Sequence, residues 1–302
     1  GAFLTVFLYS WILGAMGDLI QSTAQFDTGH VKIMTQAYKE LSDQMPNDLA
    51  LLGVDSLLEK LRDSEPEMVW AARIRFGGLL DIPDEKGETR AQGPVMGVAV
   101  DLFRSRSPEI EILKLKNVIV RGKLPEEKND ILMSEEFASR LGVKIGETAT
   151  LIGSTMNGAM AMHNFTVAGT VRFGITALDR GAMLADIHDV QYALDMADGA
   201  SEIVGYSKDM LYDDKAMLEV TKRFNENFSR EDDEFSPVMV ALSQQNGLGE
   251  YINLADALGS IIVSIFVFVM SIVIWNSGLI NGIRRYGEIG VRLAMGEPKG
   301  SL

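Results

Sequence analysis

A long uncharged run near the end of the chain constrains the fold more than any other feature. Residues 257–283 read ALGSIIVSIFVFVMSIVIWNSGLINGI and contain no charged side chain. As a helix, the central 24 or so residues would extend about 36 Å, enough to cross a hydrocarbon layer about 30 Å thick. Trp275 lies near one end of the run, where indole rings favour the membrane–water interface. We therefore predict a transmembrane helix over residues 257–283.

Residues 1–17, GAFLTVFLYSWILGAMG, are also uncharged. A signal peptide would carry a basic start and a small-residue cleavage site, and the basic flank is missing here. We expect residue 1 to lie already inside a membrane helix. Residues 1–17 would then be part of a first transmembrane helix, and the sequence would be a fragment.

The stretch between these two runs, residues 18–256, is expected to form one extracytoplasmic domain with mixed helices and strands. Short segments rich in Val, Ile and Thr predict strands, and capped amphipathic segments predict helices. No regular βαβ repeat is visible, which favours an α+β fold. The predicted strands are 30–34, 95–103, 117–122, 147–154 and 164–173; the predicted helices are 55–66, 134–142, 186–199 and 214–228; the predicted loops are 84–94 and 230–237.

Several kinds of chemistry are absent from the sequence. A net charge of −14 argues against nucleic acid as a partner, because no basic stripe is present to neutralise phosphates. The chain has no cysteine, no P-loop and no G-x-S-x-G motif. His30, His163 and His188 are not at metal-ligand spacing. We therefore expect no enzyme activity, no bound cofactor and no metal site.

The charge that follows the second hydrophobic run predicts its orientation. Arg284, Arg285, Arg292 and Lys299 crowd the last residues of an otherwise acidic chain. Lys and Arg in short flanks of a transmembrane helix stay in the cytoplasm. Residues 284–302 are therefore expected to be cytoplasmic, and residues 18–256 to lie on the other side of the membrane.

Residues 284–296 form three distinct faces on a helical wheel. One carries charge, one is apolar, and one has almost no side chain. The small face suggests close approach of another backbone, because glycines in a helix interior cost about 1 kcal/mol each. Gly296 and Pro298 are expected to end the helix. The charged face holds Arg284, Arg285, Glu288 and Arg292; the apolar stripe holds Tyr286, Ile289 and Leu293; the small face holds Gly287, Gly290 and Ala294.

The terminal sequence RRYGEIGVRLAMGEPKGSL resembles the coupling segment of ABC permeases of the MacB/LolC/FtsX type, the macrolide-export, lipoprotein-release and cell-division permeases. That family carries an R-x-x-E-I-G-[IV]-R-x-A-x-G pattern after its second membrane helix. The matching positions here are Arg285, Glu288, Ile289, Gly290, Val291, Arg292, Ala294 and Gly296. GHVKIM at 29–34 and the stretch from Val118 to Val171 are similar to the family's outer domain.

The resemblance implies an outer domain of two lobes, a porter lobe at about 26–103 and 199–245 and a sabre lobe at about 104–198. It implies a cytoplasmic ABC ATPase as partner, which would bind and hydrolyse ATP, and a second permease copy or related subunit. The family continues into a third and fourth membrane helix, so the chain is expected to be truncated at both ends. The residues expected to couple to the ATPase are Arg284, Arg285, Glu288, Ile289, Gly290, Arg292, Leu293, Ala294 and Gly296.

The implied function is that of a permease subunit in the bacterial inner membrane, with its large domain periplasmic or extracellular. It would transmit ATPase-driven motion to that domain for lipoprotein release or export of amphipathic cargo. Two alternatives stay open. One is a membrane-anchored extracytoplasmic sensor, although Gly287, Gly290, Gly296 and Pro298 interrupt the heptads that such relay helices carry. The other is a cell-division-type permease that activates cell-wall hydrolases, whose outer domain is usually smaller.

Overall fold

The computed structural model describes residues 2–103, 107–245 and 247–296. The chain divides into two compact units. We call Ile20–Asn246 the sheet unit, and Gly1–Leu19 together with Gly247–Leu302 the helical unit.

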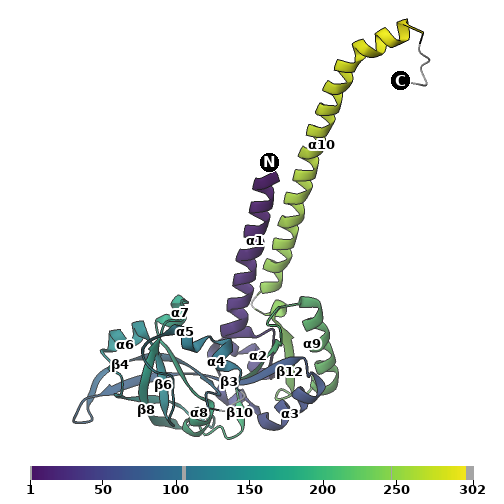
Figure 1. The fold of residues 1–302 in the computed structure, drawn as a ribbon. Helices are drawn as coiled ribbons and strands as arrows, with labels where there is room; N and C mark the ends of the chain where they lie inside the picture. The colour runs from purple at the N-terminus through teal and green to yellow at the C-terminus, as the bar shows by residue number, and fades with distance from the viewer. Residues whose placement is uncertain (1, 104–106, 246, 297–302) are drawn as a thin grey trace. The chain divides into compact units, whose positions relative to one another are not determined.

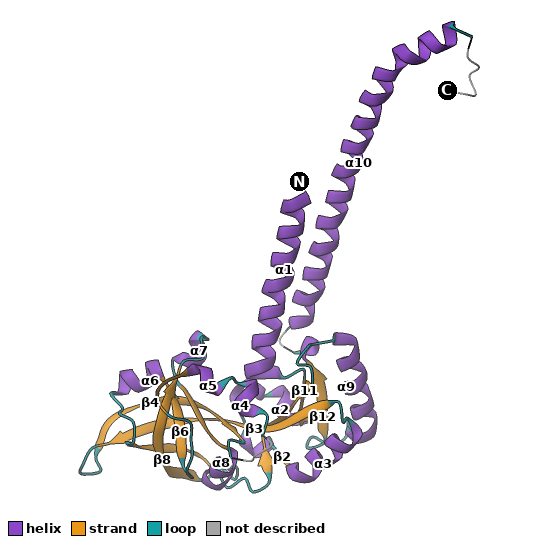
Figure 2. Cartoon of the chain, viewed as in Figure 1, coloured by secondary structure: helices purple, strands orange, loops and turns teal. Residues whose placement is uncertain are grey.

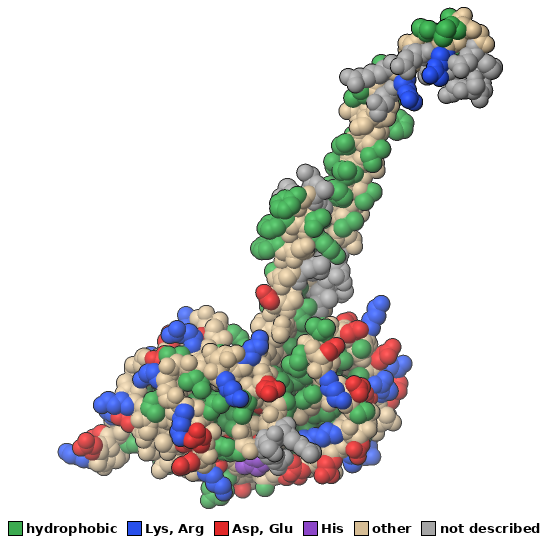
Figure 3. Space-filling model, in the orientation of Figure 1, with side chains coloured by type: hydrophobic (Ala, Val, Ile, Leu, Met, Phe, Trp, Pro, Cys, Tyr) green, Lys and Arg blue, Asp and Glu red, His purple; other side chains and the backbone are tan. Residues whose placement is uncertain are grey.

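The helical unit consists of two long helices that run side by side (Figure 1). They are α1 (Ala2–Thr23), whose last turn belongs to the sheet unit, and α10 (Leu248–Ala294). Gly259 of α10 permits their approach, because a Cβ there would lie 2.8 Å from Cε2 of Tyr9. Hydrophobic side chains cover both helices in Figure 3.

Among the described residues, one helix is long and apolar enough to cross a membrane. It covers Ala257–Ala294, within α10, with a mean hydropathy of 2.8 in its most apolar window. The predicted span at 257–283 lies inside this helix. The predicted first span at 1–17 lies on α1, which continues to Thr23, and its role as a membrane span stays a prediction.

The sheet unit is built on a ten-stranded sheet with the order β12-β1-β11-β3-β4-β9-β6-β8-β5, and β7 pairs with both β3 and β8. The long hairpin of β3 and β4 runs through its middle (Figure 2). The strands are β1 (Val31–Thr35), β3 (Met68–Pro83), β4 (Thr89–Val100), β5 (Ile119–Gly122), β6 (Asp130–Ser134), β7 (Thr148–Ser154), β8 (Met160–Val171), β9 (Ala182–Asp186), β11 (Glu202–Ser207) and β12 (Pro237–Ala241); β2 (Leu51–Leu52) and β10 (Gly199–Ala200) form a separate pair.

Short helices pack against this sheet. The apolar faces of α3 and α9 are buried through Leu58, Leu61, Met217 and Phe224, which join the main core. The helices are α2 (Gln36–Glu40), α3 (Val54–Ser64), α4 (Glu109–Ile112), α5 (Leu115–Val118), α6 (Glu135–Leu141), α7 (Thr176–Asp179), α8 (Ile187–Ala193) and α9 (Asp214–Phe228), with a π-helical turn, η1 (Ala24–Thr28), and 3-10 turns at Ser42–Gln44, Asn47–Leu49 and Leu242–Gln244.

Two of the predicted helices match the structure closely. The helix expected at 214–228 is α9, and the Asp213 carboxylate accepts hydrogen bonds from the first turn of its backbone. The helix expected at 134–142 is α6, which ends at Gly142 with φ +65°. The hydroxyl of Ser134 makes no capping bond, however. The helix predicted at 186–199 is too long, because α8 ends at Ala193.

Strand predictions were weaker. The segments at 30–34 and 147–154 correspond to β1 and β7. The loop predicted at 84–94 is wrong beyond its first half, since β4 begins at Thr89. The strand predicted at 117–122 starts too early, because α5 continues to Val118. The sequence did not indicate β3, β6, β9, β11 and β12. Most of their residues are buried, so the polar–apolar alternation of a half-exposed strand is lost.

The sheet unit has the mixed α and β content that was expected. The two predicted lobes are joined by the sheet itself. β3 pairs with β11 and β7, and β4 pairs with β9, so the central hairpin bonds to strands assigned to both lobes. The lobe boundaries at 26–103, 104–198 and 199–245 stay predictions.

Candidate functional site

The residues predicted to couple to an ATPase lie at the C-terminal end of α10. The helix runs without interruption from the apolar segment through Ala294, and Gly296 follows with φ +90°. The described side chains of this segment are exposed; Tyr286 is 80% exposed. The side chains of Arg284, Glu288 and Ile289 lie outside the described part of the structure, so the predicted pairing of Glu288 with its neighbouring arginines stays a prediction.

The structure places the glycine face of this segment in open space. A Cβ added at Gly287 or Gly290 would meet nothing within 4 Å. Each glycine in a helix interior costs about 1 kcal/mol relative to Ala, and no residue that the structure describes packs against these two. Whether this face meets the backbone of a partner stays a prediction.

A second group of candidate residues was not found from the sequence. It is a buried ionic network in the sheet unit, where η1 joins the end of α1 to β1. Arg73 of β3 forms a bidentate pair with Glu109 of α4, with Nε–Oε1 at 2.8 Å and Nη2–Oε2 at 2.9 Å. Both side chains are buried. Arg73 Nη2 also donates to the Gln25 carbonyl at 3.2 Å and to the Tyr206 hydroxyl at 3.0 Å.

Arg75, two residues along the same face of β3, holds the next part of η1. Its Nη2 donates to the carbonyls of Phe26 and Asp27, each at 3.1 Å, and its Nε pairs with Glu202 at 2.8 Å. Glu202 also pairs with Lys32 Nζ at 2.9 Å. Two arginines from one strand therefore bind three consecutive carbonyls of the turn that follows α1.

The charges of this network are mutually stabilised. Burial alone would lower the pKa of Arg73, but the Glu109 carboxylate and neighbouring groups raise it above its ordinary value. Burial would raise the pKa of Glu202, yet Arg75 and Lys32 lower it to about 2. Arg73 and Glu202 therefore stay ionised near neutral pH. Removing one partner of such a buried ion pair lowers the free energy of unfolding by several kcal/mol, because the other charge is left buried without a partner.

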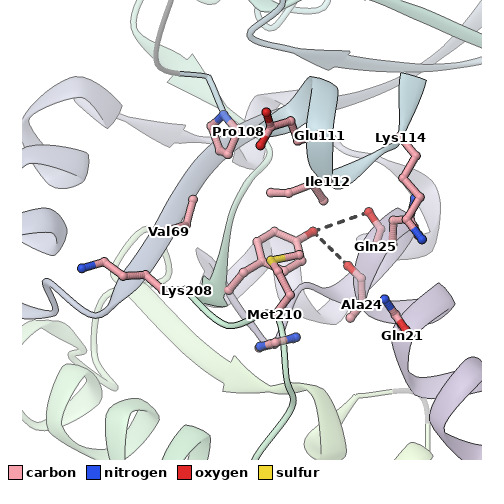
Figure 4. A pocket seen from close by; sticks show the side chains of 12 residues that line it. Gln21, Ala24, Gln25, Val69, Pro108, Glu111, Ile112, Lys114, Lys208 and Met210 are labelled. Carbon is pink, nitrogen blue, oxygen red and sulfur yellow. Dashed lines mark hydrogen bonds between the residues drawn. The ribbon is translucent and has the colours of Figure 1, made fainter. Parts of the chain in front are cut away.

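A cavity of about 270 Å³ lies beside the network (Figure 4). Figure 4 shows Gln25 and Ala24 on one wall and Ile112 and Glu111 on another, with the Tyr206 hydroxyl bonded to the Ala24 and Gln25 carbonyls at 2.9 and 3.5 Å. The walls thus come from η1, α4 and β11. The lining residues are Gln21, Ala24, Gln25, His30, Val69, Pro108, Glu111, Ile112, Lys114, Tyr206, Lys208 and Met210.

The three histidines have separate structural surroundings. His30 is buried, its Nδ1 accepts from the Ser207 backbone N–H at 3.2 Å, and burial lowers its pKa to about 4. His163 lies 2.8 Å from the Asn129 side chain, and His188 pairs with Asp186. No group of acidic or histidine side chains that could hold a metal ion occurs among the residues that the structure describes.

The missed network had one visible signal in the sequence. Arg73 and Arg75 interrupt the apolar run of VWAARIRF at the spacing of one strand face. Their partners, Glu109 and Glu202, lie far along the chain, and η1 contributes only backbone atoms. Chemically the arrangement can hold the carbonyls of η1 in place.

No protein-family model matches the chain, and no curated protein matches it significantly. Among solved structures, it is similar to the extracellular domain of the noncanonic ABC-type transporter YknZ from Gram-positive bacteria, with 11% identity, a TM-score of 0.43, and coverage of 70% of this chain and 98% of that one. It is also similar to the periplasmic region of MacB from Actinobacillus actinomycetemcomitans, with 12% identity, a TM-score of 0.48, and coverage of 75% and 94%. At these identities the likeness concerns the fold alone.

Proposed function

We propose that this chain is a membrane subunit of an ABC transport system in the bacterial inner membrane. Its sheet unit would be periplasmic or extracellular, and residues 284–296 would dock a cytoplasmic ABC ATPase. The chain would transmit ATPase-driven motion to the sheet unit, for lipoprotein release or export of amphipathic cargo. It would act with a second permease copy or related subunit. ATP would be bound by the partner, so the chain itself would not be an enzyme.

The observation that carries this proposal is the continuity of α10. The helix begins at Leu248, directly after the sheet unit in the sequence, and extends without a break through the coupling motif to Ala294. At 1.5 Å per residue, Arg284 lies about 54 Å along the helix from Leu248. Because the helix is continuous, displacement at one end would be delivered to the other.

The ionic network supports the same role for the other helix. The chain leaves α1 through η1, whose carbonyls at Gln25, Phe26 and Asp27 are held by Arg73 and Arg75. Both arginines belong to β3, which lies inside the ten-stranded sheet. Movement of α1 would therefore be passed to the sheet through charge-assisted hydrogen bonds, which are stronger than neutral ones.

The docking role can be tested by reversing charge in the terminal segment. Full-length chain carrying Glu288→Arg or Arg292→Glu would be purified from membranes of cells that produce the ATPase. We expect wild-type chain to retain an ATP-hydrolysing subunit and either variant to lose most of it, since like charges would replace complementary ones across the interface.

Lys86→Glu is a matched control, because Lys86 is exposed in the β3–β4 turn of the sheet unit and is not in the motif. It should leave co-purification unchanged. Equal retention of the ATPase by wild type, Glu288→Arg and Arg292→Glu would refute docking through this helix. Circular dichroism of each variant checks that the fold is intact.

A further inference from the structure

His30 places an unused hydrogen-bond donor on the wall of the 270 Å³ cavity beside the ionic network. The residue is only 3% exposed and lines this cavity. Its ring meets the rings of Tyr206 and Tyr212 edge to face, with centroids at 5.5 and 5.6 Å. These contacts, together with a hydrogen bond from the Ser207 backbone, fix the orientation of the imidazole.

The hydrogen bond at Nδ1 determines where the imidazole carries its proton. The backbone N–H of Ser207 donates to Nδ1 at 3.2 Å, so Nδ1 presents a lone pair. The Ser207 hydroxyl lies 3.1 Å from Nδ1 and donates to the Leu211 carbonyl at 2.7 Å. Burial lowers the pKa of His30 to about 4, so the ring is neutral near neutral pH. In a neutral imidazole with a lone pair on Nδ1, the proton is on Nε2.

No residue that the structure describes accepts a hydrogen bond from this Nε2–H. A buried donor without a partner is unfavourable, because it has lost its hydrogen bonds to water. An oxygen atom that enters the cavity would remove this penalty. His30 therefore favours an occupant with a hydrogen-bond acceptor.

The remaining inner wall of the cavity is largely apolar. Ala24, Ile112 and the ring of Tyr206 are buried, and Val69 is half-buried. Figure 4 shows Ile112, Val69 and Ala24 around the cavity. Burying an alkyl group against these side chains removes apolar surface from water, which favours an occupant that is partly hydrocarbon.

The rim of the cavity carries charges of both signs. Lys114 and Lys208 are exposed, and Lys208 Nζ lies 3.5 Å from the Glu67 carboxylate. An ionised group placed beside His30 would lose its solvation, so an uncharged acceptor is favoured there. The charged residues at or next to the rim are Glu67, Glu111, Lys114, Lys208 and Asp209, and Arg104 and Arg106, which precede Pro108 in the sequence, lie outside the described residues.

We propose that this cavity binds a small amphipathic molecule whose uncharged carbonyl oxygen, from an amide or an ester, accepts from His30 Nε2–H. Its alkyl groups would lie against Val69, Ala24 and Ile112. The occupant would also contact Tyr206, whose hydroxyl donates to the Ala24 carbonyl, so binding would stabilise η1. The site does not require an ATPase partner, so its test is separate from that of the function proposed above.

The test uses full-length chain in detergent with ¹⁵N in its three histidine rings and N-propylbutanamide as the probe. Loss of a signal in His30→Asn assigns the resonances of His30. We expect the proton of His30 on Nε2, and we expect the Nε2 resonance to shift saturably as the probe is added. The resonances of His163 and His188 should not follow the same curve.

Two analogues of the probe test the chemistry of the acceptor. N-propylbutanethioamide keeps the shape but offers sulfur, a weaker acceptor, and should bind about fivefold more weakly. Heptanoate has the same number of carbon atoms but carries a charge, and should bind at least tenfold more weakly because the carboxylate loses its solvation.

Val69→Phe locates the site, because the larger side chain would fill part of the cavity. It should weaken binding of N-propylbutanamide at least tenfold by steric exclusion. Met162→Phe is the matched control, since Met162 on β8 is 63% exposed and does not line the cavity, and it should leave the affinity unchanged. Circular dichroism checks that both variants are folded.

Four results would overturn the proposal. They are a His30 proton on Nδ1, the absence of a saturable shift at Nε2, binding of the thioamide or of heptanoate as tight as that of the amide, and an unchanged affinity in folded Val69→Phe.

Discussion

Removing the negative partner of the buried arginine is the most informative perturbation of the sheet unit. Glu109→Gln keeps the size of the side chain but leaves the Arg73 guanidinium, which is 1% exposed, without its counter-charge. Breaking one side of a buried ion pair costs about 3–5 kcal/mol. The amide oxygen of Gln can still accept one hydrogen bond, so we expect a loss near the lower end, about 3 kcal/mol.

This loss should be visible as a lower midpoint of thermal unfolding. For a unit of this size, 1 kcal/mol corresponds to about 2–4 °C, so Glu109→Gln should lower the midpoint by about 6–12 °C. Circular dichroism at 222 nm in detergent measures the midpoint, since most of the signal change comes from the sheet unit when α1 and α10 stay folded.

The chain contains a matched control for burial. Arg90 and Glu147 also form a bidentate pair, at 2.7 and 3.1 Å, but their side chains are 38% and 28% exposed. Glu147→Gln should cost about 1 kcal/mol or less, because solvent screens the pair. The double variant Arg73→Met with Glu109→Leu should recover part of the loss. If Glu109→Gln and Glu147→Gln lower the midpoint equally, burial of the network does not control its energy.

Two further predictions concern single residues of the sheet unit. Burial lowers the pKa of His30 from 6.5 to about 4. Between these two pH values the unfolded chain binds a proton at His30 that the folded chain does not bind, so the free energy of unfolding rises as the pH rises. The free energy of unfolding should be about 2 kcal/mol lower at pH 5 than at pH 7, and His30→Asn should flatten this dependence in denaturant titrations; an unchanged slope would refute it. Gly97→Ala should destabilise the unit by about 1–3 kcal/mol, because the new Cβ would lie 2.0 Å from Cζ of buried Phe76. Gly153→Ala, where the nearest atom is at 3.4 Å, should change stability little, and similar losses for both glycines would contradict the packing argument.

How much of the candidate site could be predicted depended on whether its signals were local. The residues predicted to couple to an ATPase lie close together in the sequence, so their composition and spacing were visible there, and the structure places all of them but Gly296 on α10. Their coupling role stays a prediction. The network around Arg73 gave only a weak signal. Its carboxylate, Glu109, is 36 residues away, and its other acceptors are the Gln25 carbonyl and the Tyr206 hydroxyl.

The difference between local and distant signals also explains which strands were predicted from the sequence. β7 was recognised from its content of Thr and Ile, and part of it is exposed, whereas β6 and β9 are buried throughout and were not recognised.

The sequence by itself determined the apolar helix, the charge that follows it and the ends of helices such as α6 and α9. These properties depend on hydropathy and on residues within one or two turns of each other. Only the tertiary structure decided which charges are buried together and how the turn after α1 is held. These depend on groups far apart in the chain, whose pairing is chosen by the cost of burying an unpaired charge or backbone N–H.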